Sequence, residues 1–111
     1  MEIDEQKHGA VTVLKPRGPL VQDDAEQFEQ MLNDRLSSSM GRALVDISAI
    51  PYADSRGLEA LADISESLSE SGQVLKLCGG NETLREVLDL TDLAGQFDYY
   101  EDVNTAVRSF L

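Results

Sequence analysis

The spacing of apolar residues predicts strands that alternate with helices along most of the chain. Short segments that are apolar or alternate with polar residues are typical of strands. The first two flank a turn at His8-Gly9 and predict a hairpin whose second strand ends at Pro16. The run at 44–47 is almost continuously apolar, as expected of a strand covered on both faces. The predicted strands cover residues 3–7, 10–14, 44–47, 74–78 and 97–100.

Apolar residues three or four positions apart predict four helices. Their starts are expected at Asp23 or Asp24, at Asp54 or Ser55, at Asn81, and just after Asp102. The apolar faces consist of Ala25, Phe28, Leu32 and Leu36 in the first helix, Leu58, Leu61, Ala62, Ser65 and Leu68 in the second, Leu84, Val87 and Leu88 in the third, and Val103, Ala106, Val107 and Phe110 in the fourth.

This order of elements predicts the fold class. After the hairpin, strands and helices alternate, which favours right-handed crossovers and parallel pairing. We therefore expect an α/β fold in which a mixed, mostly parallel sheet of about five strands carries four helices. Since no repeat, linker or low-complexity segment divides residues 1–111, one domain is expected over this range.

Charge limits the partners of this chain. The formal net charge is −12 and the pI is about 4.2, so contacts with nucleic acid or anionic membranes are disfavoured. A basic surface on a partner protein would be attracted, although solubility alone also accounts for an acidic composition. No apolar run is long enough to span a membrane, and the charged first residues do not resemble a signal peptide. A cytoplasmic protein without membrane insertion is expected.

The residue inventory argues against several kinds of catalytic or cofactor site. His8 is the only histidine and lies in a turn, so neither a serine triad nor a zinc site is expected. Cys78, the only cysteine, ends an apolar strand and is predicted to be a buried structural thiol. The Gly79-Gly80 pair lacks the spacing of nucleotide-binding loops and predicts a tight turn. No enzymatic activity, cofactor or metal is expected.

Ser55 stands where the strand at 44–47 gives way to a helix. Backbone N–H groups at a helix start favour an anion, so a hydroxyl there is a candidate phosphate acceptor. Gly57, in the first turn, is expected to leave the surface beside Ser55 bare for the backbone of a partner. The residues alone leave the alternative open that Ser55 only caps the helix and Gly57 only packs.

The segment VDISAIPYADSRGLEAL, residues 45–61, resembles the signature of the STAS domain family of bacterial anti-sigma factor antagonists, in which a strand ending in an acid leads to D-S-x-G-L. The opening hairpin, the Gly18-x-Leu20 turn, VLKLC with its glycines, LREVLDLTDL and the final helix also resemble the family in order and spacing. The resemblance covers essentially the whole chain.

The resemblance implies a protein-binding switch. In such proteins the serine of D-S-x-G-L is phosphorylated by the anti-sigma factor, a serine kinase of the histidine-kinase-like ATPase class, and a metal-dependent phosphatase reverses the modification. The unmodified antagonist binds the kinase and frees the sigma factor. Carried over to this chain, Ser55 is the acceptor, Asp54 its neighbour, and Gly57-Leu58 the start of the contacted helix.

Two positions depart from the family pattern. Many members have an aspartate directly after the G-x-L turn, where this chain has Val21; Asp23 or Asp24 are the candidates to take its place. The residue after the acceptor is often a small hydroxyl residue and is Arg56 here, a cation that could pair with the phosphate or with an acidic group of a partner.

Spacing adds a carboxylate stripe on the second helix. Glu59, Asp63, Glu66 and Glu70 share one face, which is either simply solvated or docks into a basic groove of a partner. The complete set of expected partner-binding residues is Asp23, Asp24, Asp54, Ser55, Arg56, Gly57, Leu58, Glu59 and Asp63.

Two other function classes stay open. A stand-alone STAS subunit of a membrane-lipid ABC transporter would use the same surface to contact the ATPase subunit. A sensor would hold a nucleotide at the strand ends and the Gly79-Gly80 turn. The sequence does not predict the oligomeric state.

Overall fold

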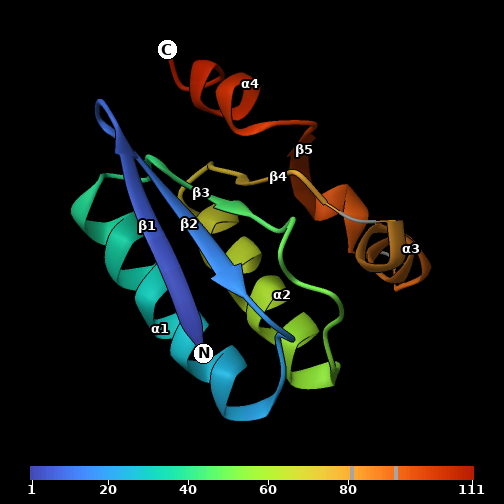
Figure 1. Ribbon diagram of the computed structural model, residues 1–111. Helices are drawn as coiled ribbons and strands as arrows, with labels where there is room; N and C mark the ends of the chain where they lie inside the picture. Colours follow the sequence, from blue (N-terminus) through green and yellow to red (C-terminus); the bar gives the residue numbers. More distant parts are fainter. Residues whose placement is uncertain (81, 92) are drawn as a thin grey trace.

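The computed structural model describes residues 1–80, 82–91 and 93–111. The chain begins with a hairpin, after which helices and strands alternate (Figure 1). The elements are β1 (Glu2–His8), β2 (Val11–Arg17), α1 (Gln22–Ser38), β3 (Ala43–Asp46), α2 (Ser55–Glu70), β4 (Leu75–Cys78), α3 (Glu82–Leu90), the short 3-10 helix η1 (Ala94–Gln96), β5 (Phe97–Tyr100) and α4 (Val103–Arg108).

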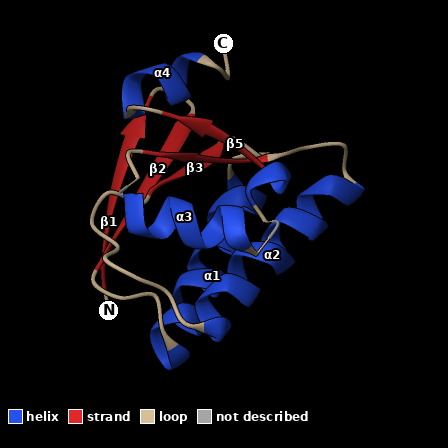
Figure 2. Cartoon of the chain, turned by 90° about the vertical axis from the view of Figure 1, so that its right-hand side faces the viewer, coloured by secondary structure: helices blue, strands red, loops and turns tan. Residues whose placement is uncertain are grey.

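The five strands form one sheet in the order β1-β2-β3-β4-β5. Only β1 and β2 pair antiparallel; every later neighbour is parallel. Helices α1, α2 and α3 cover one face of the sheet, and α4 lies on the opposite face (Figure 2). The prediction of a mixed, mostly parallel five-stranded sheet with four helices is confirmed.

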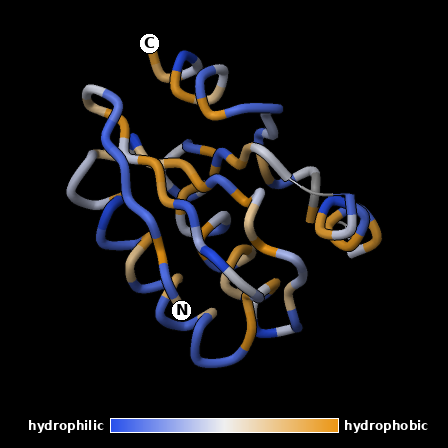
Figure 3. Tube along the Cα trace, in the orientation of Figure 1, coloured by the Kyte–Doolittle hydropathy of each residue, from blue (hydrophilic) through white to orange (hydrophobic). Residues whose placement is uncertain are grey.

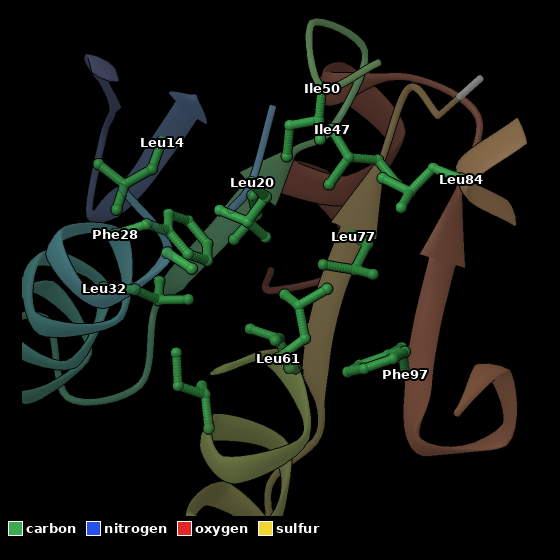
Figure 4. Close-up of a cluster of buried hydrophobic side chains, with 14 of the residues drawn as sticks. Leu14, Leu20, Phe28, Leu32, Ile47, Ile50, Leu61, Leu77, Leu84 and Phe97 are labelled. Atoms are coloured by element: carbon green, nitrogen blue, oxygen red, sulfur yellow. The ribbon is translucent and has the colours of Figure 1, made fainter. Parts of the chain in front are cut away.

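The main core fills the space between the sheet and the three helices. Large side chains from both layers, including Leu14, Phe28 and Leu61, are completely buried there (Figure 4). Each contributes roughly 1.5–3 kcal/mol by leaving water. The predicted apolar face of α1 (Ala25, Phe28, Leu32 and Leu36) is confirmed, because all four residues are buried.

On α2 the buried face is shifted from the predicted one, because Ala62, which was predicted to lie on it, is only partly buried. Leu61 and Ser65 are buried as expected, and Leu58 and Leu68 pack against the core from partly exposed positions. Ala60 and Ile64 are also fully buried, although the predicted stripe omitted them. The reason is that α2 packs against α1 as well as the sheet, so one stripe of side chains does not describe its contacts.

The short helix α4 covers the second face of the sheet through a smaller apolar cluster. Ala106 is buried there against Val13 and Leu44, among others. The Lys76 ammonium lies 3.9 Å from the centre of the Phe110 ring and donates to the Ser109 hydroxyl. Asp102 caps the helix by accepting from the Thr105 N–H at 2.7 Å, and this hydrogen bond lowers the pKa of its carboxyl.

The first hairpin is longer than predicted. Strand β2 does not end at Pro16 but continues to Arg17, with Pro16 opposite Ile3 of β1. Proline can stand in this strand because β3 pairs only with residues 12–14 of β2, so Pro16 lies beyond the doubly paired part. Strand β1 is mostly hydrophilic (Figure 3), which suits a strand at the edge of a sheet.

Two predictions near β4 are confirmed. Cys78 is buried, and burial raises the pKa of its thiol to about 12. Gly79 has φ +69° and lies at a bend, and the Gly80 N–H donates to the Tyr99 hydroxyl, so the chain changes direction at the glycine pair as predicted. Asn81, the expected first residue of the next helix, lies outside the described residues. Within the part of the chain that is described, no helix has the length and apolarity needed to cross a membrane.

Candidate functional site

Asp54, and not Ser55, is the N-cap of α2. One oxygen of its carboxylate, Oδ1, accepts from the Gly57 N–H at 2.9 Å. The other, Oδ2, accepts from the Gln22 N–H at 3.2 Å, at the start of α1. One side chain therefore ties the starts of both helices together, and they lie at the same end of the molecule (Figure 1).

The loops that lead into the two helices are also paired. The Leu20 N–H donates to the Tyr52 carbonyl at 3.0 Å, and the Asp54 N–H donates to the Leu20 carbonyl at 3.2 Å, with Leu20 and Ala53 forming a parallel bridge. Gln22 adopts a left-handed backbone with φ +45°, which is uncommon outside glycine. Its N–H bond to Asp54 stabilises this sharp entry into α1.

Gly57 has a different role from the one expected. It is buried, and a Cβ at this position would lie 2.1 Å from the Leu20 carbonyl oxygen. The expectation that Gly57 leaves a bare surface for a partner is therefore wrong. Its missing side chain lets the loop of the same chain approach α2 closely.

Ser55 is the first residue of α2 and is exposed to solvent. Since Asp54 provides the cap, the Ser55 hydroxyl is not needed to satisfy the helix start. The hydroxyl stands instead at the positive end of the helix dipole, where added negative charge is tolerated. The geometry at Ser55 is thus that of an accessible group at a capped helix start.

Arg56 does not extend freely from this site. Its Nη1 donates to Glu29 Oε1 of α1 at 3.0 Å, and the two side chains are 33% and 19% exposed. The hydrogen bond to Glu29, together with the charges of Glu59 and Glu26, raises the pKa of the guanidinium. This ion pair is a second bridge between the two helix starts.

The remaining expected residues spread over the same two helices. Glu59 and Asp63 are exposed on α2 in line with Glu66 and Glu70, and Leu58 is partly buried against the core. Asp23 is exposed on α1. Asp24 differs, because its Oδ1 accepts from the Met1 ammonium at 3.1 Å and so belongs to the contact between α1 and the start of β1.

Three residues of the site, Gln22, Glu29 and Tyr52, were not predicted from the sequence. Gln22 acts through its backbone N–H, and Glu29 is one of many acidic residues in the sequence, so neither carries a local signal. Tyr52, three residues before Ser55, is 54% exposed and lies in the paired loop. An aromatic residue in the loop before D-S-x-G-L was the one available signal, since exposed tyrosines often anchor interfaces.

These contacts define a class of site. The described residues contain no group of three or more His, Cys, Asp or Glu side chains arranged to hold a metal ion. What the geometry provides is an exposed hydroxyl at the start of α2. Asp54 and the ion pair of Arg56 join this helix start to that of α1, and Gly57 lets the Leu20 loop approach closely. Such an arrangement suits recognition by another protein, on an α/β domain with helices on both faces of a mixed sheet.

Comparison with known proteins gives the family. The STAS domain family model matches residues 2–106, and the chain belongs to this family. A Thermotoga maritima protein that carries the provisional name of an anti-sigma factor antagonist is 28% identical over 99 residues, which is 88% of each chain.

Solved structures agree with this assignment. The crystal structure of a protein from Thermotoga maritima, also provisionally called an anti-sigma factor antagonist, has a TM-score of 0.85 and 25% identity, covering 96% of this chain and 92% of that one. An anti-sigma factor antagonist from Mycobacterium paratuberculosis has a TM-score of 0.82 and 23% identity, over 97% of this chain and 92% of that one, and shows the same fold.

Proposed function

We propose that this protein is an anti-sigma factor antagonist that acts as a binding switch controlled by phosphorylation of Ser55. The exposed hydroxyl at the start of α2, within the D-S-x-G-L segment of a STAS domain, is the observation that carries the proposal. Unmodified protein binds an anti-sigma factor serine kinase and so releases the sigma factor. The protein is a ligand and a substrate of other enzymes and catalyses no reaction itself.

The modification is a phosphoryl transfer from ATP. A bond forms between the γ-phosphorus and Ser55 Oγ while the bond to the bridging oxygen breaks. ADP leaves, and the hydroxyl proton passes to a base of the kinase. A metal-dependent serine phosphatase restores the hydroxyl by hydrolysis, in which water supplies the oxygen that leaves with inorganic phosphate.

Added charge and bulk explain the release of the kinase. A phosphate adds a charge of about −1.5 to −2. The dipole of α2 tolerates this charge, so the fold persists. Asp54 precedes the modified residue and Glu59 lies one helical turn after it, so negative charge accumulates where the kinase must approach. Breaking a close interface contact in this way costs about 2–5 kcal/mol of binding free energy, which is enough to release the kinase.

The carboxylate stripe of α2 extends the proposed contact surface. Glu59, Asp63, Glu66 and Glu70 are all exposed, and a basic groove on the kinase would complement them. If they dock there, affinity falls with added salt and in the variants Glu59→Lys and Asp63→Lys. An affinity that does not change with salt would count against this docking.

A kinase assay tests the proposal. Each histidine-kinase-like serine kinase of the source organism is purified and incubated with γ-labelled ATP and the wild-type protein. Ser55→Ala is compared with Ser69→Ala, which removes another exposed hydroxyl from the same helix. We expect one kinase to label wild type and Ser69→Ala but not Ser55→Ala. Equal labelling of all three proteins would overturn the assignment of Ser55.

A further inference from the structure

The Arg56–Glu29 ion pair lies beside the proposed phosphorylation site and has no counterpart in the expected family pattern. Arg56 follows Ser55 directly in α2, and its guanidinium spans to α1. Neither partner is fully buried, so the pair can open without leaving a charge stranded in the core. Its geometry therefore permits exchange of partners.

Arg56 is also the one cation of α1 and α2 that lies near Ser55. These two helices are described completely and contain a single further basic residue, Arg35. Arg35 is in the last turn of α1, roughly 20 Å along the helix from the end that Asp54 ties to α2. It is held by Glu5 of β1 at 2.9 Å. Within these two helices, a charge that appears on Ser55 thus has one nearby arginine with which to pair, and Arg17, before the paired loop, is held by Asp4.

A phosphate on Ser55 would be further stabilised by such a counter-ion. Asp54 and Glu59 both add negative charge around it, and Asp54 already occupies the Gly57 N–H that an anion at the helix start would use. A dianionic phosphate presents more charge and more acceptor oxygens than the Glu29 carboxylate, and arginine binds phosphate in a bidentate manner. Consecutive Cα atoms are about 3.8 Å apart, so the long Arg56 side chain starts within reach of the modified residue.

We propose that phosphorylation of Ser55 draws the Arg56 guanidinium away from Glu29 and onto the phosphate. This inference rests on the proposed function and adds the regulation of the site. The exchange leaves Glu29 without its cation, so modification changes the charge presented by α1 as well as by α2. A partner that covers both helix starts then meets two altered helices, although only one serine has been modified.

The experiment places phosphoserine at position 55 during translation, so that it does not depend on any kinase. A phosphorus NMR titration of this protein is compared with that of the same protein carrying Arg56→Gln. Arg42→Gln is the matched control, because Arg42 is exposed and lies beyond the far end of α1. We expect Arg56→Gln to move the midpoint of the phosphate titration upward by about half a pH unit, and Arg42→Gln to leave it unchanged.

The Arg56 Nε–Hε signal of the phosphoserine protein gives a second readout that needs no substitution. It should follow the phosphate through its titration. The exchange would be overturned by an unchanged midpoint of the phosphate titration in Arg56→Gln. It would also be overturned by an Arg56 Nε–Hε signal that does not change as the phosphate titrates. Labelling of Ser55→Ala to the same extent as wild type in the kinase assay would instead overturn the proposed function, so the two failures are distinguishable.

Discussion

At the scale of single residues, the site depends on side chains that hold the chain in place around Ser55. Asp54 could be predicted as a neighbour of the acceptor, but its second bond, to the Gln22 N–H, joins residues 32 positions apart in the sequence. The same holds for Arg56 and Glu29, which are 27 positions apart. Such pairs follow from how α1 packs on α2, which local patterns do not contain.

Gly57 gives the most direct test of this packing. Substitution Gly57→Ala places a Cβ against the Leu20 carbonyl oxygen, so backbone must shift to accommodate it. We expect a loss of about 1–3 kcal/mol in the free energy of unfolding, measured by urea denaturation. Gly95→Ala is the control and should be close to neutral, since among the described residues no atom outside its chain neighbours lies within 4 Å of the added Cβ. Equal stability of the two variants would contradict the close approach.

Asp54 is predicted to contribute through both of its oxygens. Asp54→Ala removes the cap of α2 and the bond to α1, and should cost more than the ~1 kcal/mol of an ordinary cap. Asp54→Asn retains one acceptor oxygen and should have intermediate stability in the same denaturation experiment. If Asp54→Asn is as stable as wild type, the second acceptor bond has no energetic role.

At the scale of elements, periodicity predicted most of the fold. The apolar face of α1 and the strand at 44–47 gave clear signals, because each buries a regular set of positions. The end of β2 and the buried face of α2 were predicted less well. Pro16 suggested an end that the partial pairing of β2 makes unnecessary. Ala60 and Ile64 are buried on a helix that packs against α1 as well as against the sheet.

The helix α4 should show a pH-dependent contribution from its cap. The pKa of Asp102 is lowered in the folded protein from its ordinary value of 3.8 by the bond to Thr105. Its charge therefore stabilises the fold above that value, and the contribution disappears as pH falls through the lower folded pKa. We compare thermal unfolding of wild type and Asp102→Asn, which still caps, from pH 7 to pH 2. The melting temperature of wild type should exceed that of Asp102→Asn by less below about pH 4. A difference in melting temperature that stays constant with pH would argue against the cap as its source.

Burial in strand β4 should protect the Cys78 thiol from alkylation. Since burial raises the pKa of Cys78 to about 12, native protein at pH 8 contains almost no thiolate and exposes no sulfur. Iodoacetamide, followed by mass spectrometry, should leave native protein unmodified and alkylate it in urea. Rapid alkylation of the native state would mean that the face covered by α4 opens readily.

At the scale of the whole molecule, the residues of the proposed function lie at the end where α1 and α2 begin. The starts of α1 and α2 are joined by loop pairing, a shared cap and an ion pair, while the sheet and core hold both helices in place. Exposed Glu26 and Glu59 lie close enough to Arg56 to raise its pKa, in keeping with the net charge of −12. Resemblance to the STAS family identified this end from the sequence, whereas the side chains that organise it came from the structure.

The binding of the cognate anti-sigma factor kinase to two forms of this protein tests the central claim most directly. Calorimetric titrations compare unmodified protein with protein that carries phosphoserine at position 55, under the same salt conditions. We predict that unmodified protein binds and that phosphorylation weakens the affinity at least thirtyfold, the equivalent of about 2 kcal/mol. Equal affinity of the two forms would contradict a switch at Ser55.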